Sequence, residues 1–358
     1  MYSPIFFAGS KPLRTLIETV LMRTWQKRGV LACLLWPLAK LFQLLVTFRF
    51  ALYVLGYKLQ TRLPVPVVVV GNIFIGGTGK TPLVIWLVQQ LQAAGWQPGV
   101  ISRAYGAAAD RVIAVTPASA AAEVGDEPLL IALRSGCPVV VGRDRVAAAR
   151  ALLAAHPDTD VIISDDGLQH YALGRDVEIV LFDQRGAGNG WLLPAGPLRE
   201  PLRRRRDFTV LNAAPDAVPP ALTAATIRMH LQPQDIYRLG DPRQRQPLAE
   251  LTPGRERIVA AAGIGNPQRF FDMLSAAGLQ FSALPLPDHH VFQAQTFAGL
   301  DAERILITEK DAVKCRQIAA LHDDARIWVV PVAAQPDAGF AAPLIQMISE
   351  KKHGRSLA

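Results

Sequence analysis

The sequence is poor in cysteine and lacks the signatures of several common classes of protein. Its three cysteines, at positions 33, 137 and 315, are far apart and match no metal-ligand spacing. This spacing argues against a disulfide framework and a zinc site and favours a reducing cytosol. No helix-turn-helix, zinc or aromatic RNA-binding signature is present, so we expect no nucleic-acid partner. An Asn-Lys-x-Asp string is also missing, and Thr308–Asp311 has the wrong spacing to replace it, which argues against guanine specificity.

Acidic residues are scarce at the start of the chain. Nine cationic residues lie between Lys11 and Arg62, against the single acid Glu18. The whole chain carries a formal net charge of +8, and its pI near 9.6 indicates an anionic partner such as a nucleotide or an acidic lipid. A second basic block, Arg203 to Arg206, either faces such a surface or is a solvated run of charge.

An apolar segment follows this basic start. Residues 30 to 48 have about the length needed to cross a membrane, but Pro37, Lys40 and Gln43 interrupt them. The flanking cations and aromatic residues are typical of a headgroup boundary, which favours an in-plane or shallowly inserted helix. A transmembrane helix and a pair of amphipathic helices covering the soluble part are the alternatives. A signal peptide is not expected, because the apolar core comes late in the segment.

A phosphate-binding loop is the strongest motif. Val67–Val70 reads as a buried strand of a parallel sheet, Gly76–Thr81 reads GGTGKT, and a helix pattern begins at Thr81. Glycines let backbone N–H groups approach phosphate oxygens, Lys80 reaches the β- and γ-phosphates, and Thr81 can ligate magnesium. The usual first glycine is replaced by Phe74. The loop predicts ATP binding with Mg²⁺.

A pair of carboxylates follows a second apolar strand, within the string from Asp160 to His170. Asp165 and Asp166 end this strand in the manner of a Walker-B acid, which meets the phosphate loop at the carboxyl edge of a parallel sheet. A solvated Asp-Asp-Gly turn is the simpler alternative. A later strand-loop-helix pattern, from Arg257 to Leu274, predicts a second α/β unit.

Further strings, taken in order with GGTGKTP and SDDGLQH, resemble the tetraacyldisaccharide 4'-kinase family between about Lys58 and Lys314. The strings are Ser102–Gly106, Val124–Pro128, Val141–Arg145, Pro194–Pro201, Ala262–Pro267, Asp288–His290 and Thr308–Asp311. The resemblance implies transfer of the γ-phosphoryl of ATP to the 4'-hydroxyl of a tetraacyl glucosamine disaccharide 1-phosphate, a lipid A precursor. The family lacks the first loop glycine as well, so Phe74 fits the pattern.

The resemblance also implies the fold and the location. We expect an α/β protein whose core is a P-loop NTPase-like parallel sheet, with a membrane-associated N-terminal helix and a second, smaller α/β domain. The expected divisions are 1–62 for the helical segment, 63–225 for the kinase core, 226–240 for a two-stranded linker, 241–350 for the smaller domain and 351–358 for a polar tail. The expected place is the cytoplasmic face of the bacterial inner membrane, with its acidic surface and the lipid precursor as partners and no obligate protein partner.

The expected site residues follow by position. Asp126 matches the catalytic aspartate of the family, and His289, or its neighbour His290, would orient it. Lys80 completes the catalytic set. The predicted nucleotide-binding residues are Phe74, Ile75, Gly76, Gly77, Thr78, Gly79, Lys80, Thr81, Tyr105, Arg143 and Arg199, with Arg145 a further candidate. The predicted magnesium ligands are Thr81, Asp165, Asp166 and Gln169.

One alternative belongs to another functional class. A membrane-associated P-loop switch of the partition type would hydrolyse nucleotide to drive binding and would leave the lipid unmodified. It shares the phosphate loop, so the two hypotheses differ in whether a sugar hydroxyl needs an aligned base such as Asp126.

Overall fold

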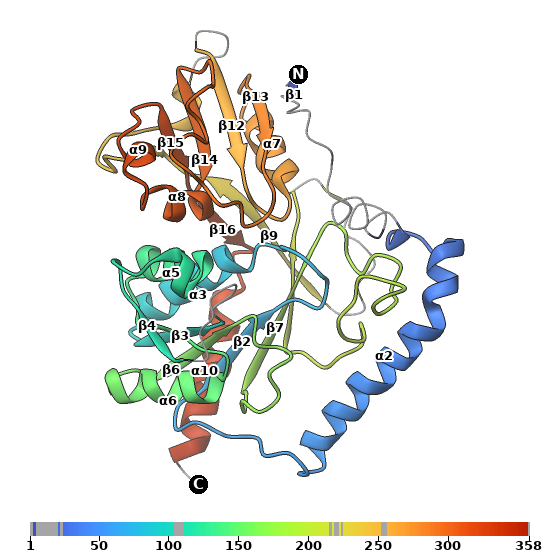
Figure 1. Ribbon diagram of the computed structural model, residues 1–358. Coiled ribbons are helices and arrows are strands. Elements are labelled where there is room, and N and C mark those ends of the chain that lie inside the picture. Colours follow the sequence, from blue (N-terminus) through green and yellow to red (C-terminus); the bar gives the residue numbers. More distant parts are fainter. Residues whose placement is uncertain are drawn as a thin grey trace.

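The computed structural model describes residues 3–4, 21, 24–103, 111–214, 217, 222, 225–251 and 256–356. Its strands form two separate sheets, each with helices packed against it, and a long helix extends along one side of the molecule (Figure 1). The protein is therefore of the α/β class, as the sequence predicts. Each sheet is the centre of its own hydrophobic core.

The larger sheet has nine strands in the order β16-β9-β8-β7-β2-β6-β3-β5-β4. Their bounds are β2 (Val67–Gly71), β3 (Pro98–Ser102), β4 (Ile113–Val115), β5 (Val139–Val141), β6 (Val161–Asp165), β7 (Val177–Asp183), β8 (Phe208–Asn212), β9 (Thr226–Pro233) and β16 (Val332–Pro336). The central strand β2 is parallel to its neighbours β6 and β7 and is buried along its whole length. This burial on both faces explains the β-branched run that marks the strand in the sequence.

Helices cover both faces of the larger sheet. They are α3 (Lys80–Ala93), α4 (Ala121–Val124), α5 (Asp126–Ser135), α6 (Arg145–Ala155) and α10 (Ala341–Ser356). The side chains of α3 and α10 share one core with β2, while those of α6 belong to the core on the opposite face. Because α10 continues to Ser356, most of the expected polar tail is helical.

The smaller sheet has seven strands in the order β1-β13-β12-β14-β15-β10-β11. Their bounds are β1 (Ser3–Pro4), β10 (Ile236–Arg238), β11 (Arg245–Gln246), β12 (Ile258–Ala262), β13 (Ser282–Pro285), β14 (Arg304–Thr308) and β15 (Ile327–Val330). The helices of this unit are η1 (Leu248–Glu250), α7 (Pro267–Ala276), α8 (Glu309–Cys315) and α9 (Ala319–His322). Strands β13, β12, β14 and β15 are parallel, so the carboxyl ends of β12 and β14 lie at one edge.

The chain crosses between the sheets twice. It leaves the larger sheet after β9 and enters the smaller one at β10, then returns from β15 to β16 through Pro331. Strand β9 pairs with β16, and β10 pairs with β11 and β15. The expected linker, 226–240, does contain the first crossing, but its two strands do not pair with each other. The smaller domain was expected to continue to residue 350, but residues 332–356 belong to the larger sheet and its helices. Strand β16 in this segment pairs with β9, about a hundred residues earlier along the chain.

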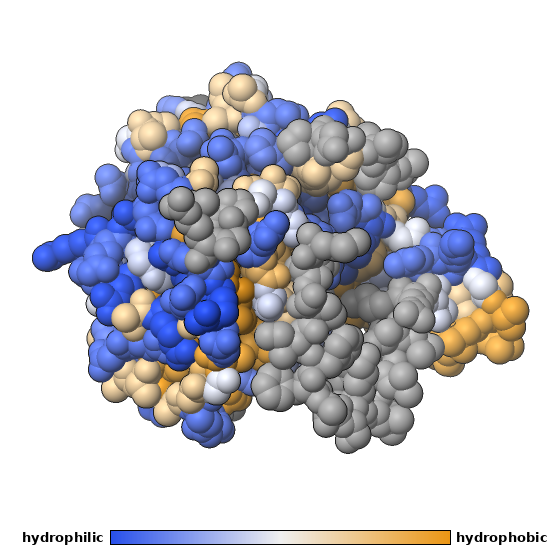
Figure 2. Space-filling view, turned by 90° about the horizontal axis from the view of Figure 1, so that it is seen from above, coloured by the Kyte–Doolittle hydropathy of each residue, from blue (hydrophilic) through white to orange (hydrophobic). Residues whose placement is uncertain are grey.

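Helix α2 (Val30–Val54) leaves most of its apolar surface uncovered. Only Ala32 and Ala39 are buried, and the exposed large side chains between residues 30 and 54 are Val30, Leu31, Leu34, Trp36, Leu38, Leu41, Leu44, Leu45, Phe48, Phe50 and Val54. Figure 2 shows apolar atoms gathered at the edge of the molecule where this helix lies. Within the described residues α2 alone is long and apolar enough to span a membrane. Its exposure disfavours a role in covering a soluble core and is compatible with membrane association.

Candidate active site

The phosphate loop joins the end of β2 to the start of α3. Gly76 and Gly79 adopt positive φ angles of 97° and 94°, a region that favours glycine. A Cβ on Gly79 would lie only 2.3 Å from Nδ2 of Asn212. That same nitrogen donates a hydrogen bond of 2.9 Å to the Thr78 carbonyl, so the end of β8 holds the loop in place.

Asn72 organises the first half of the loop from inside. Its fully buried side-chain nitrogen donates to the carbonyls of Phe74 and Gly76, at 2.7 and 2.9 Å. The Ile75 N–H donates to the Pro197 carbonyl at 3.0 Å, and the Phe74 ring belongs to the hydrophobic core. Sequence reasoning missed Asn72, and its only signal was its place directly after the strand.

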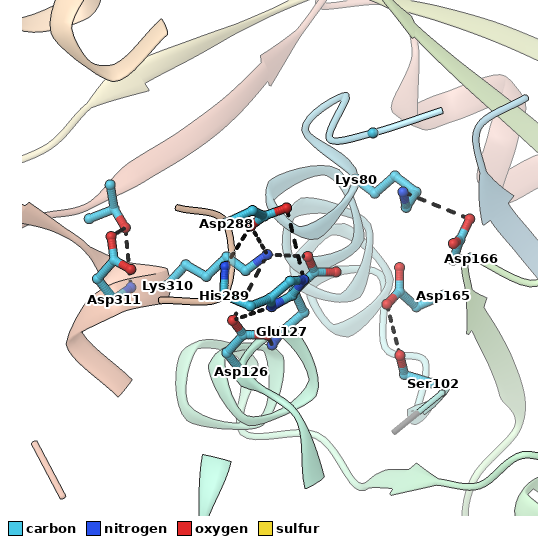
Figure 3. A network of polar contacts seen from close by, with 12 residues as sticks. Lys80, Ser102, Asp126, Glu127, Asp165, Asp166, Asp288, His289, Lys310 and Asp311 are labelled. Atoms are coloured by element: carbon cyan, nitrogen blue, oxygen red, sulfur yellow. Dashed lines mark hydrogen bonds and ion pairs between the residues drawn. The ribbon is translucent and has the colours of Figure 1, made fainter. Parts of the chain in front are cut away.

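Lys80 points to the acid that follows β6. Its Nζ donates to Oδ1 of Asn72 at 3.2 Å and lies 3.8 Å from Oδ1 of Asp166 (Figure 3). Thr81 follows in the first turn of α3 and is buried. The phosphate-loop lysine and the carboxylate pair therefore meet at one edge of the larger sheet, as the Walker-B pattern requires.

Asp165 is the buried member of the carboxylate pair. Its Oδ2 accepts a hydrogen bond of 2.9 Å from the Ser102 hydroxyl, whereas Oδ1 has no hydrogen-bond partner among the described residues. Burial, together with the negative charges of Glu127 and Asp166, raises the pKa of Asp165 to about 6. A buried carboxylate oxygen without a donor fits a divalent cation, which would supply the missing positive charge.

Asp166 is the more accessible member and adopts a left-handed backbone, with φ 47°. Its Oδ1 lies 3.2 Å from Nη2 of Arg199, which also donates to the Asn72 carbonyl at 2.6 Å. Burial alone would raise the pKa of Asp166, but the charges of Lys80 and Arg199 outweigh it and lower the pKa below its usual value. Arg199 thus lies beside the phosphate loop.

Two other residues predicted to bind magnesium or nucleotide, Gln169 and Arg143, lie away from the contact between Lys80 and Asp166. Gln169 donates its side-chain N–H to Glu200 at 2.7 Å, and its carbonyl accepts a bond from Arg49 of α2. Arg143 is exposed in the loop after β5. Tyr105 lies outside the described residues.

Arg145 contacts the carboxylate pair through the backbone of Asp165. It is buried and donates to the carbonyls of Gly142 and Asp165, both at 3.0 Å. Burial lowers the pKa of Arg145 to about 10. Arg145 therefore fixes the backbone of Asp165, and its fork does not face open solvent.

Two of the four arginines after Pro201, Arg204 and Arg206, are half-buried and paired, whereas Arg203 and Arg205 are exposed. Arg204 pairs with Glu178 and, at 3.1 Å, with Glu200, and Nε of Arg206 donates to the Thr209 hydroxyl at 2.7 Å. These two side chains stabilise the segment between Arg199 and β8, so the block is not simply a solvated run of charge.

A second polar cluster lies where the two sheets approach each other. Asp126 starts α5, and its Oδ2 lies 3.3 Å from Nδ1 of His289, which follows β13 in the smaller unit (Figure 3). His289 has a positive φ of 55°. The neighbouring His290 packs edge-on against Phe292 instead, with ring centroids 5.0 Å apart. Of the two candidate histidines, His289 is therefore the one that contacts Asp126.

Two lysines of α8 complete this cluster. Nζ of Lys310 and of Lys314 lie 3.9 and 3.8 Å from Oδ2 of Asp126, and Lys310 also pairs with Glu127 at 2.8 Å. Burial alone would raise the pKa of Asp126, but the hydrogen bond from His289 and the two lysine charges hold it below its usual value. The same hydrogen bond raises the pKa of His289. Sequence reasoning did not assign these lysines a role, although Lys310 stands in one of the family strings.

The smaller unit also approaches the phosphate loop directly. A Cβ added to Gly265, in the loop after β12, would lie 3.1 Å from Oδ2 of Asp288 and 3.7 Å from the backbone nitrogen of Gly77. The neighbouring Gly263 N–H donates to the fully buried Asp311 at 2.9 Å. A side chain at position 265 would therefore press on Asp288, next to the nucleotide loop.

Known proteins are similar to this chain in sequence. A family model described as Tetraacyldisaccharide-1-P 4'-kinase matches residues 31–349. The Tetraacyldisaccharide 4'-kinase of Janthinobacterium sp. (strain Marseille) is 59% identical over 349 residues, covering 96% of this chain and 99% of the relative. That of Herminiimonas arsenicoxydans is 56% identical over 358 residues, covering 96% and 98%.

A solved structure agrees with the fold. The "apo" form of LpxK from Aquifex aeolicus in complex with ATP superposes with a TM-score of 0.75 and 27% identity, and the match covers 90% of this chain and 99% of that one. Because the family model spans most of the sequence and curated relatives exceed half identity over nearly their whole length, the chain belongs to the tetraacyldisaccharide-1-phosphate 4'-kinase family.

Proposed function

We propose that this protein transfers the γ-phosphoryl group of ATP to the 4'-hydroxyl of a tetraacyl glucosamine disaccharide 1-phosphate. The observation that carries the proposal is the meeting of two groups of residues at the junction of the sheets: a phosphate loop with its carboxylate pair, and the Asp126–His289 pair. A switch of the partition type needs the first group alone. Membership of the kinase family, and ATP in the related Aquifex structure, support the same reading.

The nucleotide-binding site consists of the loop from Phe74 to Thr81, and Lys80 and Arg199 are its cations. Lys80 and Arg199 both contact Asp166, so each is already turned toward the place where phosphate charge would lie. Guanidinium and ammonium groups there would neutralise the oxygens of the transferred group. Arg143 and Tyr105 remain proposed contacts of the nucleotide.

Magnesium would be held by Asp165 and Asp166, with Thr81 and Gln169 as further ligands. No three His, Cys, Asp or Glu side chains converge as a metal site in the described part of the chain, so phosphate oxygens and water would complete the coordination. The bound ion would neutralise charge on the β- and γ-phosphates. The buried, unpaired Oδ1 of Asp165 is the feature that favours this assignment.

Asp126 would act as the base. Its carboxylate takes the proton of the sugar hydroxyl as the hydroxyl oxygen attacks the γ-phosphorus, the bond to the β-phosphate oxygen breaks, and ADP leaves. His289 orients Asp126 and stabilises its charge before the reaction, and Lys310 and Lys314 keep it ionised. In phosphoryl transfer such alignment and charge neutralisation provide most of the rate enhancement.

The lipid substrate is consistent with α2 and its flanking cations. The exposed apolar side chains of this helix would enter one leaflet, while the exposed Lys40 and Lys58 would meet anionic headgroups. We propose an anchor at the cytoplasmic face of the inner membrane, where ATP and the lipid precursor meet.

The domain division is also proposed. The larger unit would comprise residues 63–233 with 332–356, and the smaller unit residues 236–330. The two crossings between the sheets, at 234–235 and at Pro331, are joined by a 2.9 Å hydrogen bond from the Gln234 N–H to the Pro331 carbonyl.

The direct test supplies ATP labelled at the γ-phosphate, magnesium and the tetraacyl disaccharide 1-phosphate in detergent micelles. We expect labelled lipid with the natural protein. With Lys80→Ala the rate should fall by at least about a hundredfold, because the variant lacks the cation that reaches the transferred phosphate. Absence of labelled lipid from the natural protein, with ATP hydrolysis retained, would favour the switch instead.

A further inference from the structure

Arg185 reaches the phosphate loop from the end of β7, and neither the motif nor the resemblance assigned it a role. Its Nη2 donates to the Gly77 carbonyl at 3.1 Å. Its Nη1 lies 3.8 Å from the point where a Cβ on Gly76 would stand. The guanidinium therefore lies beside the two glycines that precede the tight turn into α3.

The position of Arg185 is fixed on two sides. Its Nε and Nη2 bind the carboxylate of Asp183, at 3.0 and 2.7 Å, and Asp183 is only 2% exposed. The guanidinium carbon stands 4.3 Å from the centre of the Phe74 ring. A buried carboxylate and an aromatic face together hold the planar fork in one orientation.

The contact between Arg185 and the Phe74 ring explains why an aromatic residue stands at the position where P-loops usually have glycine. The Asn72 amide draws the Phe74 carbonyl inward, and the ring becomes the platform on which Arg185 rests. Within the described residues nothing accepts a hydrogen bond from Nη1 of Arg185, so this donor is available to a ligand in the loop.

The smaller unit takes part through α7. Nη1 of Arg269 lies 3.5 Å from Oδ2 of Asp183, the same carboxylate that binds Arg185. Asp183 therefore carries two guanidinium groups, one directed to the phosphate loop and one supplied by the other unit.

We propose that Arg185 binds the terminal phosphate of ATP as a further cation, in addition to Lys80 and Arg199. In a phosphate loop, the backbone N–H groups that lead into the helix cradle the inner phosphates and the lysine reaches the outer ones. Arg185 lies before that turn, at Gly76 and Gly77, so the phosphate within its reach is the outermost one. There its fork neutralises charge on the group being transferred. The proposal rests on the proposed function for the identity of the nucleotide.

The test compares two nucleotides in the full chain. Affinities for ADP and for a non-hydrolysable β,γ-imido analogue of ATP are measured with magnesium, for the natural protein and for Arg185→Gln. We expect the analogue to bind about 10- to 100-fold more weakly to the variant, because one charge-assisted contact is lost, and ADP to change by less than about threefold. Arg185→Lys, which keeps the charge, should recover part of the affinity for the analogue.

Arg326→Gln is the matched control. Arg326 forms the same fork with an acid two residues earlier, Asp324, at 3.0 and 2.8 Å, but it lies in the smaller unit. Its replacement should leave both affinities unchanged. Equal weakening of ADP and analogue by Arg185→Gln would reveal a role limited to shaping the loop and would overturn the proposal, as would no weakening of either. Neither result depends on lipid phosphorylation, so failure of the proposed reaction would be recognised separately.

Discussion

Asp126 and His289 meet although 163 residues separate them along the chain. The hydrogen bond between them raises the pKa of the half-exposed imidazole and, together with the charges of Lys310 and Lys314, lowers the pKa of the buried carboxylate. At a pH below the pKa of His289 the pair carries a proton on the imidazole. Loss of that proton leaves the carboxylate a stronger acceptor for the proton of a sugar hydroxyl.

This pair predicts opposite effects of pH on activity and on stability. A histidine whose pKa is raised on folding stabilises the folded state fully below its unfolded pKa of about 6.5, and this contribution is lost as the pH rises through the folded value. Turnover should rise over the same interval, above about pH 6.5. Rate profiles and melting temperatures between pH 5 and 9 would test this. In His289→Gln, neither the rise in turnover nor the fall in melting temperature over this pH range should occur. If this variant kept the same pH dependence of turnover as the natural protein, the account would be contradicted.

The sequence indicated some site residues and left others unrecognised. Lys80, Asp165 and Asp166 could be predicted because each lies within a short local motif at the end of a strand. Asn72, Asn212 and Lys310 could not, because their roles depend on contacts with segments that the fold brings together. The choice between His289 and His290 likewise required the turn that directs one ring to Asp126 and the other to Phe292.

At the scale of elements, α2 is the part whose surface least resembles that of a soluble protein. Leu34, Leu41 and Phe48 are 71%, 55% and 61% exposed and make little contact with the rest of the molecule. The length of the apolar segment predicted this helix. How the residues before the helix are held to the rest of the molecule could be seen only in the structure. The Trp25 indole donates to the Pro194 carbonyl at 2.9 Å and Arg28 to the Asn189 carbonyl at 3.1 Å.

Replacing Leu34, Leu41 and Phe48 together by serine should release the protein from vesicles that contain anionic lipid. Each large side chain contributes about 1.5 to 3 kcal/mol when removed from water, so partitioning should fall by more than about a hundredfold. Co-sedimentation with vesicles measures it. Leu133→Ser, which removes a partly exposed leucine from α5, is the control, and unchanged partitioning of the triple variant would refute the anchor.

In the linker between the sheets, the strands could be predicted from the sequence but their pairing partners could not. Two short β segments around 226–240 were expected, and strands β9 and β10 are there, but their partners are β16 and β15. Hydrophobic alternation indicates that a segment is a strand. It does not identify a partner that follows a hundred residues later.

At the scale of the whole molecule, an ion pair joins the two units beside the crossings. Nη1 of Arg134, near the end of α5, lies 2.6 Å from Oε1 of Glu309, at the start of α8, and Arg134 also donates to Gln234 at 3.3 Å. The Glu309 side chain is only 7% exposed, and burial raises its pKa despite the arginine. Because α5 begins with Asp126 and α8 carries Lys310, this contact also sets the spacing of the proposed base and its lysines.

Arg134→Ala should destabilise the protein by about 2 to 4 kcal/mol, because a buried carboxylate is left without its partner. Urea unfolding measures the change. The double variant Arg134→Ala, Glu309→Gln should recover part of the loss, since no charge remains buried. If the single and double variants were equally unstable, the ion pair would not be the cause.

The central claim is that residues of both units form one active site, with the nucleotide held by the larger unit and the base aligned by the smaller. The most direct measurement compares turnover and ATP affinity for Asp126→Asn and the natural protein, with the exposed Asp301→Asn as control. We predict that turnover falls by roughly 10² to 10⁴ while ATP affinity changes by less than about threefold. Equal loss of turnover and ATP affinity, or unchanged turnover, would contradict the account.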